Sequence, residues 1–207
     1  TYRELERDVV PFIEEAGFFS SVGARWNAGQ YTLRFANGSR VRLIHCRSKA
    51  DAANIRGQCL GLYVDERSLL DPAAVDTLAL RIRSGDPSTP VVGIRSGTNP
   101  GGVGHSRLKE EFIDPAPTGR VPLPILDQET GEPLLFPDSD APLTRWFLPS
   151  TAADNPNLDS TYYLRFRMMS AQARRAYRDG DWSVFEGMRF GSWTPGVHIG
   201  RVSDWPL

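Results

Sequence analysis

Residues 60–66 read LGLYVDE, and this stretch decides the fold class that the sequence predicts. The apolar run at positions 59–64 is typical of a buried strand in a parallel sheet. Asp65 and Glu66 follow at its carboxyl end, where a nucleotide-hydrolysing enzyme needs one carboxylate for magnesium and a second to polarise water. We therefore predict that Asp65 binds Mg²⁺, directly or through water, and that Glu66 is catalytic. The competing interpretation is a strand that simply leaves the core for solvent.

Strand and helix patterns alternate downstream of this stretch. Pro72 opens a helical pattern that we expect to end at Gly85. A second buried run at 91–94 predicts a strand, and residues 106–113 predict a short helix. This alternation indicates an α/β fold with a mostly parallel sheet.

The upstream segment predicts elements of a different kind. Residues 2–16 have apolar residues at helical spacing, and Pro11 should kink or restart that helix. Residues 31–46 alternate between apolar and polar side chains around Asn37-Gly38, which predicts a β-hairpin.

The downstream third is less regular. Residues 114–142 are rich in proline, glycine and acids and predict an irregular excursion, and residues 145–149 predict one more strand. Residues 160–179 have helical spacing, with Ser170 as the cap of a second helix inside that span. The segment 182–207 is rich in glycine and tryptophan, which is typical of a linker or domain edge.

Composition limits the possible functions. The chain has 207 residues, a 40% hydrophobic fraction and a formal net charge of −1, so no overall basic field attracts nucleic acid and any DNA contact must come from a local patch. One candidate patch is the basic helical region at 165–178, for which an ordinary solvated helix face is equally consistent. The spacing of cysteines and histidines argues against zinc, and the absence of a long apolar run argues for an intracellular protein without a membrane span.

Polar residues also follow the second predicted strand. Thr98 and Asn99 could sense a γ-phosphate there, although a turn made by the sequence NPGG at 99–102 is the competing interpretation. The glycines at 101–104 resemble a phosphate cradle but lack the Gly-Lys-Ser/Thr ending. No G-x-x-x-x-G-K-[ST] sequence occurs in the 207 residues, so we expect the phosphate-binding loop to lie before Thr1.

Several blocks of the chain together resemble terminase large subunits of tailed bacteriophages. Residues 61–66 and the sequence GTNPGGVGH at 97–105 resemble that family most specifically. Further matching blocks occur in the family's order: Phe147-Leu148-Pro149, Asp154-Asn155-Pro156, Tyr162-Tyr163-Leu164, Arg174-Arg175-Ala176-Tyr177 and Gly180-Asp181-Trp182.

The resemblance implies a partial RecA-like (P-loop NTPase) ATPase domain at residues 1–181, lacking the Walker A segment, with a linker at 182–207 toward an absent nuclease. It implies that Asp65 is the Walker B acid, that Glu66 is the catalytic glutamate, and that Thr98-Asn99 is the coupling motif that responds to ATP. Arg56 stands where some members have an arginine that acts across a subunit interface; a solvated surface arginine is the alternative. Arg67 departs from the family's usual alanine.

The whole protein implied by the resemblance uses ATP and Mg²⁺ to move double-stranded DNA into a capsid and then cuts the DNA. Its implied partners are a portal protein, a terminase small subunit and further copies in a ring, and its place is the procapsid portal in the host cytoplasm. This segment alone should be inactive. The alternatives are another DNA-translocating or helicase-like ATPase, or a non-enzymatic prophage remnant that serves as an interaction module.

Overall fold

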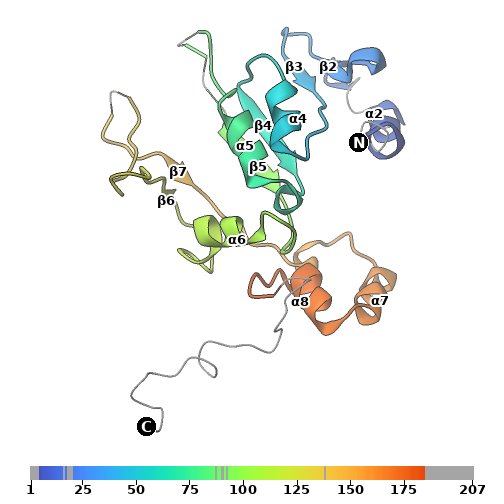
Figure 1. The fold of residues 1–207 in the computed structure, drawn as a ribbon. Helices are drawn as coiled ribbons and strands as arrows, with labels where there is room; N and C mark the ends of the chain where they lie inside the picture. Colours follow the sequence, from blue (N-terminus) through green and yellow to red (C-terminus); the bar gives the residue numbers. More distant parts are fainter. Residues whose placement is uncertain are drawn as a thin grey trace. The chain divides into compact units, whose positions relative to one another are not determined.

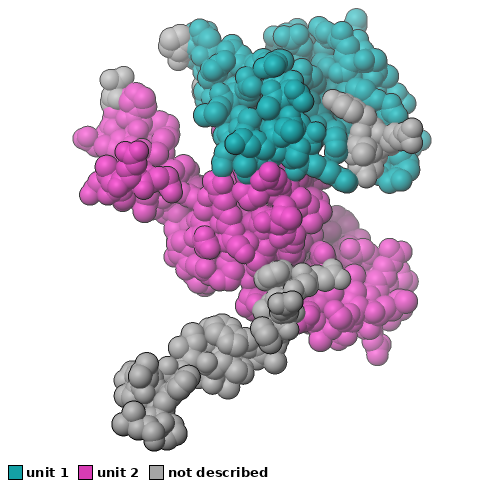
Figure 2. Space-filling view, in the orientation of Figure 1, with its two compact units in different colours: residues 1–60, 73–91 teal, residues 61–72, 92–207 magenta. Residues whose placement is uncertain are grey.

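The computed structural model describes residues 5–15, 17, 21–86, 88–89, 91, 93–137 and 139–184. The chain divides into two compact units, which Figure 2 colours separately. Unit 1 contains residues 1–60 and 73–91, and unit 2 contains residues 61–72 and 92–207. Within the described ranges, no helix has the length and apolar character needed to cross a bilayer.

A three-stranded antiparallel sheet organises the first part of unit 1 (Figure 1). Its strands are β1 (Arg25–Asn27), β2 (Thr32–Arg34) and β3 (Arg40–Arg42), in that order. The predicted hairpin is confirmed: Gly38 has a φ of 85°, and its N–H donates to the Phe35 carbonyl at 3.0 Å. Strand β1 was not predicted, because three residues are too few for a clear alternation.

One face of this sheet packs on the N-terminal helical segment. That segment is a π-helix, η1 (Leu5–Val9), followed by α2 (Val10–Glu15), so the predicted interruption near Pro11 is present. The buried residues are Ile13, Ala24 and Leu33, with Val9, Trp26, Phe35 and Leu43 packed around them. A 3-10 turn, η2 (Ala28–Gln30), connects β1 to β2.

Two helices follow in unit 1. Helix α4 (Lys49–Asn54) begins at a capping box formed by Ser48 and Asp51. Helix α5 (Pro72–Ala79) buries Ala74, Val75 and Leu78.

The prediction that α5 continues to Gly85 is wrong, because the helix ends at Ala79. The backbone after it bonds to another segment instead: Cys59 donates to the Arg81 carbonyl at 2.9 Å and accepts from the Arg83 N–H at 2.9 Å. Ile82 accordingly forms a parallel bridge with Cys59. This pairing satisfies backbone groups that a further helical turn would otherwise have used.

A parallel strand pair organises unit 2. Strand β4 (Gly61–Asp65) pairs with β5 (Gly93–Gly97), and the register places Asp65 opposite Gly97. The first predicted strand is confirmed. The second begins at Gly93 rather than at position 91 and extends to Gly97; Val92 lies outside the described residues.

Short helical turns follow both strands. A 3-10 turn, η3 (Arg67–Leu69), comes after β4, and α6 (His105–Leu108) comes after the glycine-rich loop behind β5. Helix α6 continues as a π-helix, η4 (Lys109–Ile113), so the predicted helix at 106–113 is confirmed. The result is a mixed α/β structure with a parallel strand pair, in agreement with the predicted fold class.

The excursion at 114–142 is more ordered than predicted. Strands β6 (Leu123–Pro124) and β7 (Thr144–Arg145) pair antiparallel, and isolated bridges join Leu126 to Pro133 and Leu135 to Pro142. The predicted strand at 145–149 is thus shorter and starts one residue earlier. Prolines occupy several paired positions and have no N–H to donate, which keeps each ladder short and conceals it from the sequence pattern.

The last described part of unit 2 is helical. After a 3-10 turn, η5 (Ala152–Asp154), come α7 (Ser160–Met168) and α8 (Ala171–Asp179). Ser170 caps α8 as predicted, accepting from the Ala173 N–H. Trp182 packs with Leu108 and Ile113. Residues 185–207, most of the predicted linker, lie outside the described residues.

Candidate functional site at the ends of the parallel strands

Asp65 is the last residue of β4 and Glu66 follows it in the turn, and both are exposed. Glu66 has φ 47° and ψ 50°, the left-handed region that non-glycine residues rarely adopt. Its N–H donates to Oδ1 of Asp65 at 3.1 Å, which fixes one carboxylate oxygen beside the turn. Backbone strain of this kind costs on the order of 1–3 kcal/mol and is concentrated at functional sites. The strand therefore ends in a strained turn that bears two adjacent exposed carboxylates.

Thr98 joins the end of β5 to the turn after β4. Its Oγ1 accepts a hydrogen bond from the Ser68 backbone N–H at 2.9 Å, and its hydroxyl donates to the Asn99 carbonyl at 3.3 Å. Ser68 is 2% exposed, so this bond is shielded from competing water. The structure thus brings Asp65, Glu66 and Thr98 to one edge of the sheet, as the sequence predicted, with exposed Asn99 next to them.

The glycine-rich loop at 101–104 packs against the same turn. The Gly104 N–H donates to the Ser68 carbonyl at 2.7 Å. A Cβ added to Gly102, which has a φ of 75°, would lie 2.5 Å from that same carbonyl oxygen. Ser68 therefore bonds to Thr98 through its N–H and to the loop through its carbonyl. No sequence pattern points to Ser68, because its backbone atoms make both bonds.

The loop at 101–104 does not form a phosphate cradle. The Gly101 N–H donates to Nδ1 of His105 at 3.0 Å, and the Gly104 N–H is held by Ser68, so two amides that could face an anion have protein acceptors. Asp65 by contrast suits Mg²⁺, which commonly binds through one or two carboxylates together with water and substrate phosphates. In the described part of the chain, no group of three or more His, Cys, Asp or Glu residues could hold a metal. Asp65 could therefore hold Mg²⁺ only together with water and substrate phosphates, and the phosphates would need binding groups from elsewhere.

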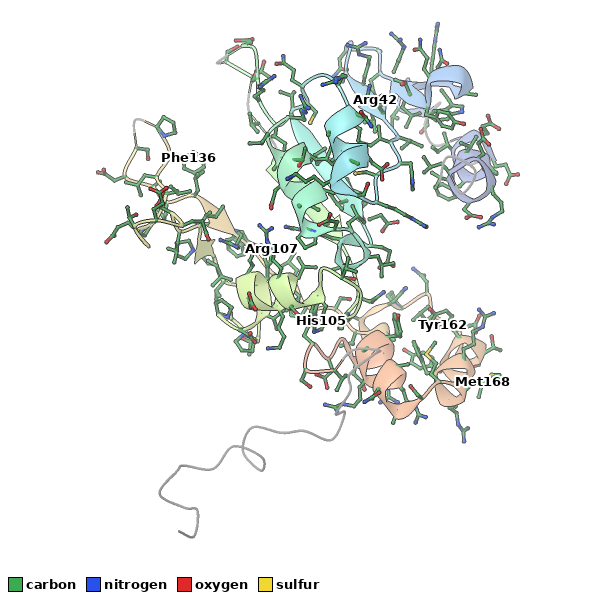
Figure 3. The ribbon with its side chains drawn as sticks, in the orientation of Figure 1. Arg42, His105, Arg107, Phe136, Tyr162 and Met168 are labelled. Carbon is green, nitrogen blue, oxygen red and sulfur yellow. The ribbon has the colours of Figure 1, made fainter. Side chains whose placement is uncertain are left out.

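His105 ties the loop to Trp182. The imidazole is 3% exposed and stacks on the Trp182 indole with ring centroids 5.3 Å apart. Burial and the nearby Lys109 lower the pKa of His105, while a hydrogen bond with the Trp182 backbone raises it by less. His105 therefore favours the neutral form and connects the loop to Trp182. Figure 3 labels it on α6.

The lowered pKa predicts how stability depends on pH. His105 in the unfolded chain has a pKa near its ordinary value of 6.5, so the unfolded state binds a proton first as the pH falls. The stabilisation is complete above pH 6.5 and is lost as the pH falls through the folded-state pKa. Urea unfolding from pH 7.5 to 5 should show a steeper loss of unfolding free energy for the wild type than for His105→Asn, which does not titrate. Equal slopes would contradict the prediction.

Arg67, which departs from the resembled pattern, is turned into unit 2. Its side chain is 15% exposed, lies 4.0 Å from the Glu111 carboxylate and stands 5.4 Å from the centre of the Phe112 ring. Arg145 approaches the same carboxylate at 3.3 Å and the same ring at 5.6 Å. Arg107 completes the group at 2.7 Å from Glu111. The Arg67 side chain therefore connects the turn after Glu66 to Glu111 and Phe112, and it is not a solvated side chain.

Arg56 lies in unit 1 and is exposed. Its backbone carbonyl accepts a hydrogen bond from the Arg42 guanidinium at 3.2 Å. This contact does not test whether Arg56 acts on a neighbouring subunit, so that role stays a prediction.

Taken together, the fold and the site define a mixed α/β protein with acidic and hydroxyl residues at the carboxyl ends of parallel strands. Its fold is similar to that of the large terminase of a thermophilic bacteriophage, whose structure was solved in complex with ADP. The TM-score is 0.55 at 18% sequence identity, and the alignment covers 88% of this chain and 39% of the terminase chain. This chain thus spans less than half of the terminase's length. No family model matches the chain, and no curated protein matches it.

Proposed function

We propose that this chain is part of the ATP-hydrolysing motor of a phage large terminase, with a RecA-like sheet of which β4 and β5 are two strands. The observation that carries the proposal is the junction of the two strand ends. There, Thr98 Oγ1 accepts a hydrogen bond from the N–H of Ser68, which lies in the turn that follows Asp65 and Glu66. The fold likeness to a terminase bound to ADP supports the choice of nucleotide. In this proposal ATP and Mg²⁺ are the cofactors.

The roles follow from the chemistry of each position. Asp65, with one oxygen fixed by the Glu66 N–H, offers the other to Mg²⁺. Glu66 orients and deprotonates the attacking water as a general base. When bound, Mg²⁺ would neutralise negative charge on the phosphates. Arg56 would act from one subunit on the nucleotide of the next.

The junction also offers a route for coupling. A change at Glu66 is transmitted to Ser68 within the same turn, and Ser68 bonds to both Thr98 and Gly104. The loop is in turn bonded to His105, which stacks on Trp182. This contiguous set of contacts would connect the nucleotide state to the segment beyond Trp182.

The remaining parts of the motor would be supplied from outside this chain. The triphosphate requires a Gly-Lys-Ser/Thr loop, which these 207 residues lack. We propose double-stranded DNA, a portal protein and a terminase small subunit as partners of the whole protein, which would form a ring at the procapsid portal in the host cytoplasm. Its nuclease would follow the segment 182–207.

The proposal is tested by comparing this chain with the product of the longest open reading frame that encodes it. We expect the 207-residue chain to hydrolyse no ATP above background, and the longer product to contain the loop and to hydrolyse ATP with stimulation by duplex DNA. Hydrolysis can be followed by phosphate release. A longer product that lacks the loop, or stimulation by single strands only, would overturn the motor proposal in favour of an interaction module or a helicase-like ATPase.

A further inference from the structure

A second feature belongs to unit 1, whereas the strand ends described above belong to unit 2. The segment 17–57 contains seven basic residues and one acidic residue, within a chain whose net charge is −1. The basic residues are Arg25, Arg34, Arg40, Arg42, Arg47, Lys49 and Arg56. The acidic one, Asp51, is engaged in the capping box of α4. Positive charge is therefore concentrated on the three-stranded sheet and the chain that follows it.

Strand pairing collects the arginines in a row. The register places Arg25 opposite Arg34 and Arg34 opposite Arg40, one from each strand. Arg42 lies two residues beyond Arg40 and therefore on the same face, because side chains alternate along a strand. All four are exposed. Figure 3 labels Arg42 on this part of the chain.

The two faces of the sheet differ in kind. Trp26 and Leu33 project from the other face into the packing against α2. The arginine face also bears Asn27 and Thr32, and in the described strands it carries no aromatic or aliphatic side chain.

These arginines stabilise nothing in the described part of the protein by ion pairing. None of Arg25, Arg34, Arg40 and Arg42 forms a salt bridge with a described residue; Arg34 donates to the Gln30 amide oxygen at 3.0 Å, and Arg42 to the Arg56 carbonyl. Like charges directly opposite each other on a sheet are destabilising. A local electrostatic cost that no ion pair with a described residue offsets is typical of a functional surface.

The geometry points to double-stranded DNA as the occupant, and we propose that the arginine face binds its phosphate backbone without reading its sequence. Arginine binds phosphate oxygens with a planar fork of donors. Adjacent strands lie about 4.8 Å apart, so the row from Arg25 to Arg40 is about 10 Å long. This equals the axial length that holds about three phosphates of one DNA strand, which are spaced about 3.4 Å apart along the axis.

The composition of the face argues against other anionic partners. Single strands are normally held by aromatic side chains on which bases stack, and membrane-bound surfaces insert apolar side chains; the described strands present neither beside the arginines. The choice of DNA over other nucleic acids rests on the proposed function. The row of arginines is a feature of the structure and does not depend on that proposal. Binding would need no nucleotide.

The test measures the binding of the full 207-residue chain to a fluorescein-labelled 30-base-pair duplex of random sequence, by anisotropy without nucleotide from 50 to 200 mM KCl. The test variant replaces Arg25, Arg34 and Arg40 with Gln. The matched control replaces Arg165, Arg167 and Arg178 with Gln, which removes equal charge from the other basic region, on α7 and α8.

We expect the test variant to weaken binding at least about tenfold and to reduce the slope of log K against log salt by about 2–3. The control should change binding less than about threefold by the same reasoning.

Folding is measured separately by thermal unfolding. The test variant should unfold at the same or a higher temperature, because it removes repulsion between opposite like charges. No wild-type binding, an equal loss in the control, or tighter binding to a single strand with as many phosphates would overturn the proposal. Arginine-dependent binding to phosphatidylserine vesicles as tight as that to the duplex would also overturn it. Because ATP is absent, these results do not depend on whether the hydrolysis proposal holds.

Discussion

Glu66→Gln is expected to abolish most ATP hydrolysis by the motor protein that contains this segment. Loss of a general base lowers turnover by about 10²–10⁴-fold. Gln has the same length and branching as Glu and tolerates the left-handed backbone no worse, so the strained turn at φ 47° should remain. ATP affinity should be nearly unchanged, because Asp65 still offers its carboxylate to Mg²⁺.

The measurement is single-turnover phosphate release together with equilibrium binding of a fluorescent ATP analogue. The matched control is Glu110→Gln, an equal charge change at an exposed position of η4 in the same unit. If Glu66→Gln retained more than about a tenth of the wild-type turnover, Glu66 would not be the general base. If both variants lost turnover equally, a general effect of charge would be the better explanation.

Gly102→Ala is expected to cause the largest loss of stability among single substitutions at the strand ends. Two costs combine there: a φ of 75°, which alanine tolerates poorly, and a Cβ placed 2.5 Å from the Ser68 carbonyl oxygen and 2.8 Å from a Leu69 methyl group. The backbone cost is about 1–2 kcal/mol, and forced overpacking adds about 1–3 kcal/mol. We therefore expect a total of about 2–5 kcal/mol, because relief would require the loop to leave Ser68.

Urea unfolding of the 207-residue chain provides the measurement. Gly131→Ala is the control, because Gly131 has nearly the same φ, 74°, with nothing within 4 Å of the added Cβ. It should cost only the backbone share, about 1–2 kcal/mol. Equal destabilisation by the two variants would show that the loop does not pack tightly on Ser68.

Local patterns were enough to predict many elements of this protein. The cap at Ser170 and the αL residue Gly180, with φ 64°, divide and end the helices where the sequence placed them, because capping depends on neighbours along the chain. Asp65 and Thr98 could be placed at one edge of the sheet, because the carboxyl ends of parallel strands meet there. Their roles in hydrolysis remain predictions that the variants above test.

The errors have the opposite cause. The helix expected to reach Gly85 ends at Ala79 because Cys59, distant in sequence, accepts and donates the backbone bonds of the segment that follows. The strand pairs in residues 114–142 could not be predicted from the sequence pattern, because prolines occupy several of the paired positions. In both cases a non-local backbone partner overrides the local pattern.

The sequence by itself determined the α/β class, the hairpin at Asn37-Gly38 and the carboxylates at the end of β4, because periodicity, turn residues and caps act over a few neighbouring positions. Only the tertiary structure decided that the buried Ser68 backbone joins Thr98 to the glycine loop, and that Arg67 packs on Phe112. The alignment of Arg25, Arg34 and Arg40 was likewise decided by the register between strands. Register depends on which buried faces pack together, and a chain read in one dimension does not contain that information locally.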